Sequence, residues 1–331
     1  MPISSRVTVL VSGGDAVTPF TTPQLACASG LAAGNTATAL RDAFLDAGID
    51  VFTAPAMNGR GPVREPRSDE FGAFGGMPVV LPAHMTIIST GDIDNNGEHL
   101  ARFAQHLHHE YGVSEIDWVG HSNGGLFARA ATRILRETAA PIAVRSLTTL
   151  GTPWHGSNPL RILAGELDES VAANDQVCQT FLTAFKEHEH RALGLQHQNT
   201  RSYLDGAHGW NAAQAGVLDE IPVLLVAGTA LHEAGGEPEY WPHDGLVSEH
   251  SALASELGAD VLPIRRAVSY PLLHSIYIAE VLGESWQLGM TWNPNVLQQV
   301  VDFVLEMRGA SHQSPGGYGV ASAGGSAGRA S

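Results

Sequence analysis

Short apolar runs alternate along the chain with amphipathic stretches of helical spacing. Apolar runs of roughly four to eight residues between turn residues are typical of buried strands, and the longer amphipathic stretches are typical of helices. This alternation predicts an α/β fold, in which a mostly parallel central sheet carries helices on both faces. The expected strands are 7–11, 49–54, 116–119, 144–150, 221–229 and 261–264. One expected helix begins near residue 36, and three others cover 98–111, 126–136 and 295–307.

Two long segments interrupt this pattern. Residues 58–96 are a connection rich in glycine and proline, and loops of such length are usually functional or mobile. Residues 158–218 are too long for one crossover, and they include an amphipathic helix that carries Val177, Phe181, Leu182 and Phe185 on one face. We expect this insertion to be a helical cap or lid over the carboxyl edge of the sheet, with extra scaffold helices as the alternative.

The domain organisation follows from these interruptions. Residues 1–157 and 219–308 are expected to form one α/β core, with 158–218 inserted as the cap. The tail 309–331 consists mostly of glycine, serine and alanine and has little to bury, so we expect it to be disordered.

A candidate nucleophile lies between the third expected strand and the helix that follows it. The segment is Gly120-His121-Ser122-Asn123-Gly124, a G-x-S-x-G pattern in the strand-to-helix context where such a serine is held on a tight turn. The helix N-terminus directs free N–H groups toward the place where an oxyanion would form. In the alternative interpretation, Ser122 only caps the helix.

Several segments together resemble the bacterial lipases and esterases of the α/β-hydrolase superfamily. They are 97–102, 119–129, Leu150-Gly-Thr-Pro-Trp-His-Gly-Ser157 and His243-Asp-Gly-Leu-Val-Ser248, and they occur in the same order as in those enzymes. The resemblance implies an α/β-hydrolase fold and a serine hydrolase of the esterase or lipase type. It indicates no particular substrate.

The resemblance and the chain order of this fold, serine then acid then histidine, indicate the other two members of a catalytic triad. Asp244 lies in an Asp-Gly turn after the strand that ends near residue 229, and Glu233 and Glu239 are the alternative acids of that connection. For Asp244 alone, a turn-capping role is the other interpretation. His274 follows the last expected core strand, where the related enzymes place the catalytic base. The other histidines considered are excluded by their order in the chain: His232, His243, His250 and His312.

The second donor of an oxyanion hole is expected from the turn after the first strand. Related lipases usually show His-Gly-x there, whereas this chain has Ser12-Gly13-Gly14-Asp15. We predict that the N–H groups of Gly14 and Asn123 form the hole, with Asp15 as the alternative to Gly14. The glycines are equally compatible with a plain tight turn. Trp154, His155, Met57, Phe71 and Phe74 are candidate pocket-lining residues by position alone.

Composition and charge argue against some classes of binding partner. The 331 residues carry a formal net charge of −16, which argues against nucleic acid and anionic membrane surfaces as partners. No run of residues is long and apolar enough for a membrane span, and no secretory signal is visible, so we expect a cytoplasmic protein. The sequence leaves the oligomeric state undetermined, and a bridge between the two cysteines, Cys27 and Cys178, remains open.

No cofactor and no metal are expected. Residues 92–97 match the first half of a calcium-binding loop, but Phe103 stands where the closing glutamate is needed. The histidine groups at 106–109 and 188–190 lack metal-ligand spacing. The expected substrate is a small-molecule or lipid-like ester, hydrolysed through an acyl-enzyme. The sequence does not distinguish an esterase from an amidase, a lactonase or an acyltransferase that uses the same triad. A non-catalytic binding protein with this fold is the alternative outside the enzymes.

Overall fold

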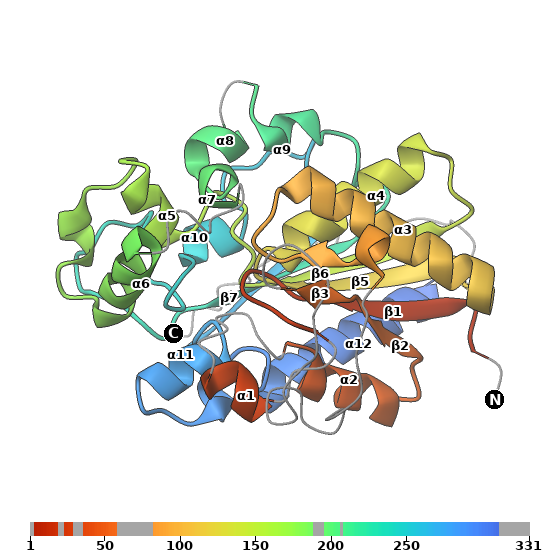
Figure 1. Cartoon of the computed structure of the whole chain (residues 1–331), viewed down its shortest axis with the longest axis horizontal. Helices are drawn as coiled ribbons and strands as arrows, with labels where there is room; N and C mark the ends of the chain where they lie inside the picture. Colours follow the sequence, from red (N-terminus) through yellow and green to blue (C-terminus); the bar gives the residue numbers. More distant parts are fainter. Residues whose placement is uncertain are drawn as a thin grey trace, which may run out of the picture.

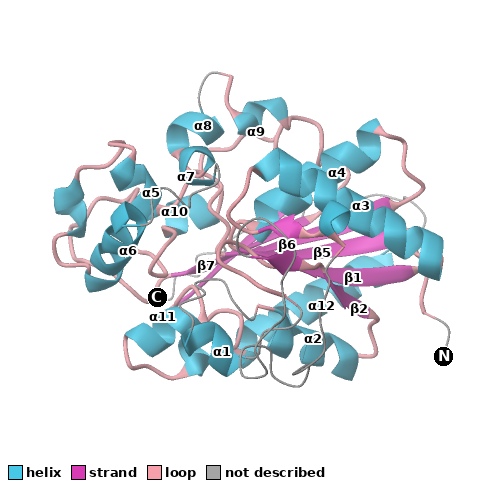
Figure 2. Ribbon diagram, viewed as in Figure 1, coloured by secondary structure: helices cyan, strands magenta, loops and turns pink. Residues whose placement is uncertain are grey.

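The computed structural model describes residues 3–18, 23–28, 36–57, 82–187, 195–205 and 208–310. A six-stranded sheet runs through the middle of this part of the chain (Figures 1 and 2). Its strand order is β2-β1-β5-β6-β7-β8, and every neighbouring pair is parallel. The strands are β1 (Arg6–Val11), β2 (Val51–Thr53), β5 (Glu115–His121), β6 (Ala143–Leu150), β7 (Val223–Gly228) and β8 (Arg265–Tyr270). Two short strands, β3 (Ala56–Met57) and β4 (Ile87–Ile88), pair separately.

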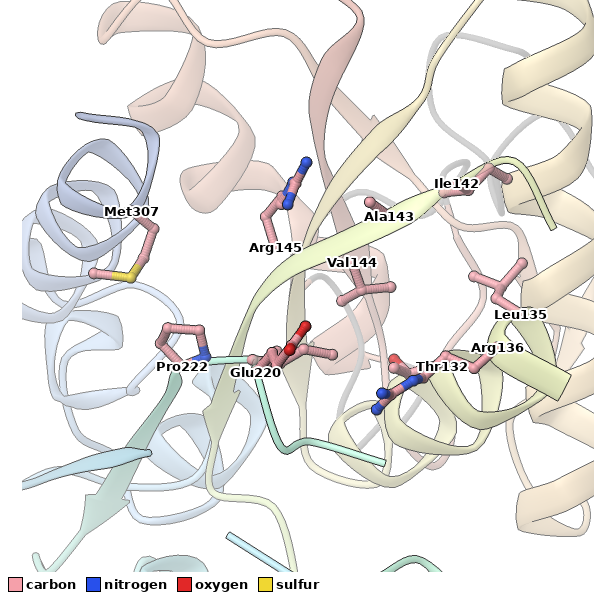
Figure 3. Close-up of a pocket in the computed structure, with 11 residues that line it drawn as sticks. Thr132, Leu135, Arg136, Ile142, Ala143, Val144, Arg145, Glu220, Pro222 and Met307 are labelled. Carbon is pink, nitrogen blue, oxygen red and sulfur yellow. The ribbon is translucent and has the colours of Figure 1, made fainter. Parts of the chain in front are cut away.

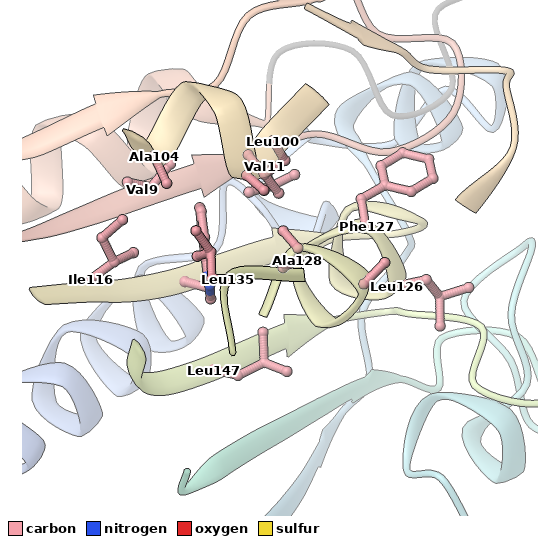
Figure 4. Packing of buried hydrophobic residues seen from close by; sticks show 14 of the residues in the cluster. Val9, Val11, Leu100, Ala104, Ile116, Leu126, Phe127, Ala128, Leu135 and Leu147 are labelled. Carbon is pink, nitrogen blue, oxygen red and sulfur yellow. The ribbon is translucent and has the colours of Figure 1, made fainter. Parts of the chain in front are cut away.

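Helices cover the sheet on both faces. The longer ones, α3 (Ile93–Tyr111) and α4 (Gly124–Glu137), lie on one face, while α2 (Ala37–Asp46) and α12 (Pro294–Ala310) lie on the other (Figure 1). Successive strand residues point to opposite faces, so Trp118 joins the first core and Val119 the second. Figure 4 shows the first core, in which Val9 and Leu147 lie between the strands and helices α3 and α4. Because both faces are buried, β7 appears in the sequence as a continuous apolar run and β1 as a nearly continuous one.

The segment 158–218 consists of short helices rather than long ones. Together they lie beyond one end of the strands, beside and above the sheet in the view of Figure 1. The helices are α5 (Asn158–Leu163), α6 (Gln176–Glu187), α7 (Leu195–Gln198), α8 (Arg201–Asp205) and α9 (Trp210–Ala213). The remaining short helices are α1 (Pro23–Ala28), α10 (Glu249–Ala252) and α11 (Ile276–Val281), with single turns at Ala83–Met85, Glu169–Ala172 and Trp286–Leu288.

The predicted fold class is confirmed, but one predicted strand is wrong. Residues 261–264 form turns, and the last strand of the sheet is the following segment, β8. Val261 and Leu262 are buried in the core, which explains why they look like strand residues in the sequence. Strand β8 is instead at the edge of the sheet and mostly exposed, so it lacks an apolar run.

Helix boundaries also differ from the prediction. Helix α3 begins at Ile93 rather than at Glu98, so most of the calcium-like segment 92–97 is helical. Helix α12 continues to Ala310, two residues into the predicted tail, and 311–331 lie outside the described residues. The same is true of 58–81 in the long connection, including Phe71 and Phe74.

A buried carboxylate ties the central strand to both chain ends. Asp117 of β5 is fully buried, and its Oδ1 accepts hydrogen bonds from Arg6 Nη2 at 2.7 Å and from Ser146 Oγ at 2.7 Å. Its Oδ2 accepts from Arg6 Nε at 2.9 Å and from Arg308 Nε at 3.2 Å. The carboxylate therefore neutralises two arginines in the interior.

We expect Asp117→Asn to lower the free energy of unfolding by about 3 kcal/mol, because it leaves buried arginine charge uncompensated. Urea unfolding followed by circular dichroism measures this loss. The control is Glu306→Gln, which breaks the exposed pair with Arg266 and should cost at most about 1 kcal/mol. Equal losses in the two variants would contradict the buried role of Asp117.

Candidate active site

Ser122 occupies a tight turn between the end of β5 and the start of α4. Its backbone has a φ of 55°, in the left-handed region that residues other than glycine rarely adopt. The turn is held from outside: the Ser122 N–H donates to the Leu150 carbonyl at 2.8 Å, and Thr152 Oγ1 donates to the Ser122 carbonyl at 2.7 Å. Ser122 is thus kept in a strained backbone conformation by its neighbours on the sheet.

The two glycines of the motif allow the chain segments to approach closely. A Cβ on Gly120 would lie 2.5 Å from the backbone nitrogen of Gly125. A Cβ on Gly124 would lie 2.1 Å from the Val11 carbonyl oxygen. Both distances are too short for real atoms, so this strand–turn–helix geometry requires glycine at both positions.

Asp244 and His274 form a buried pair at the same edge of the sheet. His274 Nδ1 and Asp244 Oδ2 are 2.7 Å apart, and both side chains are fully buried. The other carboxylate oxygen, Oδ1, accepts the N–H groups of Leu246 at 2.9 Å and Val247 at 2.8 Å. The His274 N–H also donates to the Asp244 carbonyl at 2.8 Å. Because a carboxylate only accepts, the His274 Nδ1 carries the proton and Nε2 is left as a base.

This pair lies beside the serine turn. Gly151, which directly follows the hydrogen-bond partner of Ser122, would place a Cβ 2.8 Å from Asp244 Oδ2 and 2.9 Å from His274 Nδ1. The buried Nε2 of His274 has no hydrogen-bond partner among the described residues, so the Ser122 hydroxyl does not donate to it here. Such bonds are often long or poorly aligned before a substrate binds.

The turn after β1 packs directly against Ser122. A Cβ on Gly13 would lie 2.4 Å from the Ser122 Cβ and 2.8 Å from the Asn123 nitrogen. Within the described part of the chain, the N–H groups of Gly14 and Asn123 make no hydrogen bond. Asp15 follows with a φ of 52°. The turn that carries the expected donor Gly14 is therefore adjacent to the turn that carries the expected donor Asn123.

The alternative acids lie elsewhere and have other partners. Glu239 accepts hydrogen bonds from Arg201 at 2.5 Å and Arg161 at 2.7 Å, and these bonds lower its pKa to about 2. Glu233 accepts a bond from Asn174 at 3.2 Å. Only Asp244, of the three acids considered, is bonded to His274.

About a third of the chain is similar in sequence to a known lipase. No family model matches the chain. A triacylglycerol lipase from Pseudomonas fragi is 30% identical over 110 residues, which are 32% of this chain and 33% of that lipase. The chain thus matches about a third of the length of this curated relative.

Solved structures are similar over nearly the whole chain. The mature lipase BlEst2 of Bacillus licheniformis has a TM-score of 0.51 at 13% identity, covering 92% of this chain and 94% of its own. The chain has the α/β-hydrolase fold. Naproxen esterase of Bacillus subtilis has a TM-score of 0.41 at 14% identity, covering 92% and 85% of the two chains. At 13% identity the BlEst2 likeness shows the fold alone.

The inserted segment contacts the candidate site at two places. Asn199 Nδ2 donates to the side-chain oxygen of Asn123 at 2.9 Å, so the insertion touches the residue after Ser122. On α6, Val177 and Phe181 pack with Ile278 of α11, the helix that follows His274. No sequence pattern indicates the Asn199 contact, because its two residues lie 76 positions apart.

Trp154 and His155, considered above as pocket-lining residues, are both buried. Trp154 is fully buried and stacks on the Arg129 guanidinium, whose carbon lies 5.0 Å from the ring centroid; burial lowers the Arg129 pKa to about 9. His155 Nδ1 and Asp205 Oδ2 are 2.6 Å apart, and the same carboxylate accepts a bond from Asn211. These residues attach the insertion to the α/β core instead.

A pocket of about 350 Å³ lies at the opposite edge of the sheet from Ser122, where β6 and β7 begin (Figure 3). Its walls include Val144, Pro222 and Met307, with Arg136 and Glu220 among the charged groups. None of the residues considered for catalysis contributes to it. Arg136 is already bonded to two main-chain carbonyls, those of Gly216 and Val217.

The remaining sequence features have structural partners. Asn96, in the calcium-like segment, exchanges two hydrogen bonds with the main chain of Ile88. Asp94 pairs with Arg133 at 3.1 Å. Both cysteines are free thiols, so the bridge left open by the sequence is not formed. Among the described helices, none combines the length and apolar character that crossing a membrane requires.

Proposed function

We propose that this protein is a serine hydrolase that cleaves carboxylic esters through an acyl-enzyme intermediate. The observation that carries the proposal is the buried Asp244–His274 pair beside a serine held at a φ of 55°. A serine hydroxyl is a weak nucleophile until a base removes its proton, and an acid must orient that base. The proposed substrate is a small-molecule or lipid-like ester.

The proposed steps use groups of this chain alone. His274 Nε2 takes the proton of the Ser122 hydroxyl as the oxygen attacks the ester carbonyl. Asp244 holds the Nδ1 proton and stabilises the imidazolium that forms. His274 then passes the proton to the leaving alcohol as the ester bond breaks, and the acyl group stays on Ser122. In the second half, His274 takes a proton from a water molecule as that water attacks the acyl carbonyl. The bond between the acyl group and Ser122 then breaks, and His274 returns the proton to the Ser122 oxygen.

The negative oxygen of the tetrahedral intermediate needs fixed donors. We propose the N–H groups of Asn123 and Gly14, which lie on the two adjoining turns and donate to no acceptor among the described residues. Losing one such donor typically costs about a hundredfold or more in rate. Asn123 begins the α4 helix, whose dipole also favours negative charge there.

The test is covalent labelling with a fluorophosphonate, which phosphonylates only activated serines. We expect one adduct, mapped by mass spectrometry to Ser122, and no adduct after the His274→Gln change that removes the base. An ester panel of increasing acyl length, with mass detection of the acyl-enzyme, then identifies the preferred substrate. Absence of labelling at Ser122 in the folded wild-type protein would favour a non-catalytic binding role.

A further inference from the structure

His121 lies between Gly120 and Ser122 and takes no part in the proposed steps. It is the last residue of β5, and its side chain is fully buried. Its ring packs against the ring of His274, with centroids 4.6 Å apart and planes tilted by 39°. The residue next to the nucleophile is therefore in direct contact with the proposed base.

Both ring nitrogens of His121 have a partner. Nε2 lies 2.8 Å from the main-chain carbonyl oxygen of His274, and Nδ1 lies 2.9 Å from the hydroxyl of Thr36. A carbonyl only accepts, so Nε2 must carry a proton. Burial, and next to it the proximity of His274, hold the pKa of His121 well below its usual value. The ring is therefore neutral, and its Nδ1 accepts from the Thr36 hydroxyl.

With His121 included, His274 is held at three points. Its Nδ1 is bonded to Asp244, its main-chain N–H to the Asp244 carbonyl, and its main-chain carbonyl to His121. The first two contacts both come from Asp244. The third comes from the last residue of β5, which directly precedes Ser122. It therefore joins the main chain of the base to the strand that leads into the nucleophile turn.

We infer that His121 is a positioning residue for His274: its Nε2–H holds the His274 carbonyl and so sets the distance between the base and Ser122. This inference rests on the proposed function. A misplacement of about 1 Å in a catalytic group can lower the rate on the order of a hundredfold, so loss of the contact should be visible in kcat.

Three substitutions separate the hydrogen bond from the packing of the ring. In His121→Gln the side-chain amide nitrogen reaches the position of Nε2 and can still donate to the His274 carbonyl. In His121→Asn only the position of Nδ1 is reproduced. In His121→Phe the ring is kept and both hydrogen bonds are lost.

We expect kcat for ester hydrolysis to fall about 10- to 100-fold in His121→Asn and His121→Phe, with KM within about twofold of wild type. His121→Gln should retain more than a third of the wild-type kcat. The matched control is His108→Phe, which removes a similar imidazole–carbonyl contact (Nδ1 to the Val113 carbonyl, 2.8 Å) at the far end of α3 and should leave kcat unchanged. A wild-type kcat in folded His121→Phe, or equal losses in all three variants, would overturn the inference.

A second readout does not depend on turnover. We expect the proton between His274 Nδ1 and Asp244 to give a far-downfield ¹H NMR signal in the wild type, and we expect this signal to broaden in His121→Phe and to persist in His121→Gln. An unchanged signal in His121→Phe would also overturn the inference. If wild-type Ser122 is not labelled by the fluorophosphonate, the proposed function fails; if it is labelled at the same rate in every His121 variant, only this inference fails.

Discussion

The Ser122→Ala variant should lose at least about 10⁴-fold in kcat for a chromogenic short-chain ester, with its stability almost unchanged. Alanine keeps the Cβ, so the strain of the left-handed turn is the same in both proteins. The hydroxyl of Ser122 makes no hydrogen bond to the described residues, so its removal breaks no structural contact. The loss should therefore be confined to the chemical step.

The measurement is kcat by initial rates, combined with thermal unfolding of both proteins. Ser170→Ala, at an exposed serine of the insertion, is the control and should keep wild-type activity. If Ser122→Ala retains more than about 1% of the activity and fluorophosphonate still labels the protein, another serine is the nucleophile.

The second large effect is expected from Asp244→Asn, which should lower kcat by about 10³- to 10⁴-fold. The N–H groups of Leu246 and Val247 require an oxygen at the Oδ1 position, so the amide oxygen of the new side chain is held there. Its NH₂ group then faces His274 Nδ1 and donates to it. The imidazole proton moves to Nε2, and the base that should activate Ser122 is lost.

This variant should fold like the wild type, because every turn hydrogen bond is kept. Glu239→Gln is the matched control, since Glu239 is the alternative acid of the same connection and is bonded only to arginines. We expect it to lower stability slightly and to leave kcat within about twofold. A larger loss of kcat in Glu239→Gln than in Asp244→Asn would reverse the assignment of the acid.

The strands covered on both faces could be predicted from the sequence, whereas the exposed edge strand β8 could not. Strand β7 and most of β1 are the apolar runs that two covered faces demand, and β5 and β6 carry shorter apolar runs among polar residues. Strand β8 lies at the edge and alternates mostly between exposed and half-buried positions, so its pattern resembles that of a loop. The sequence predicts a strand at 261–264 instead, because Val261 and Leu262 are apolar. Both side chains are buried in the core, although their backbone is not in a strand.

The candidate site divides in a similar way. Ser122 could be predicted because its surroundings are local: an apolar strand, two glycines and a helix within a few residues. Asp244 and His274 could be predicted from chain order and resemblance, and the structure brings them within hydrogen-bond distance. Their catalytic roles, and that of Gly14, stay predictions until the variants are measured.

Sequence pattern alone could not assign a role to His121 or Asn199. The partner of His121 is the carbonyl of a residue 153 positions away, and that of Asn199 is a side chain 76 positions away. The partners of Trp154 and His155 were equally out of reach: the Arg129 guanidinium lies over the Trp154 ring, and His155 contacts Asp205.

The sequence by itself determined the α/β class, the serine turn and the order of the three candidate residues, because each depends on local backbone preferences and on the burial of consecutive side chains. Only the tertiary structure decided which acid meets the histidine, how the insertion attaches to the core, and that His121 contacts His274. These depend on side chains brought together by the crossing of distant strands, and on hydrogen bonds to main-chain carbonyls, which every residue offers and no sequence pattern distinguishes.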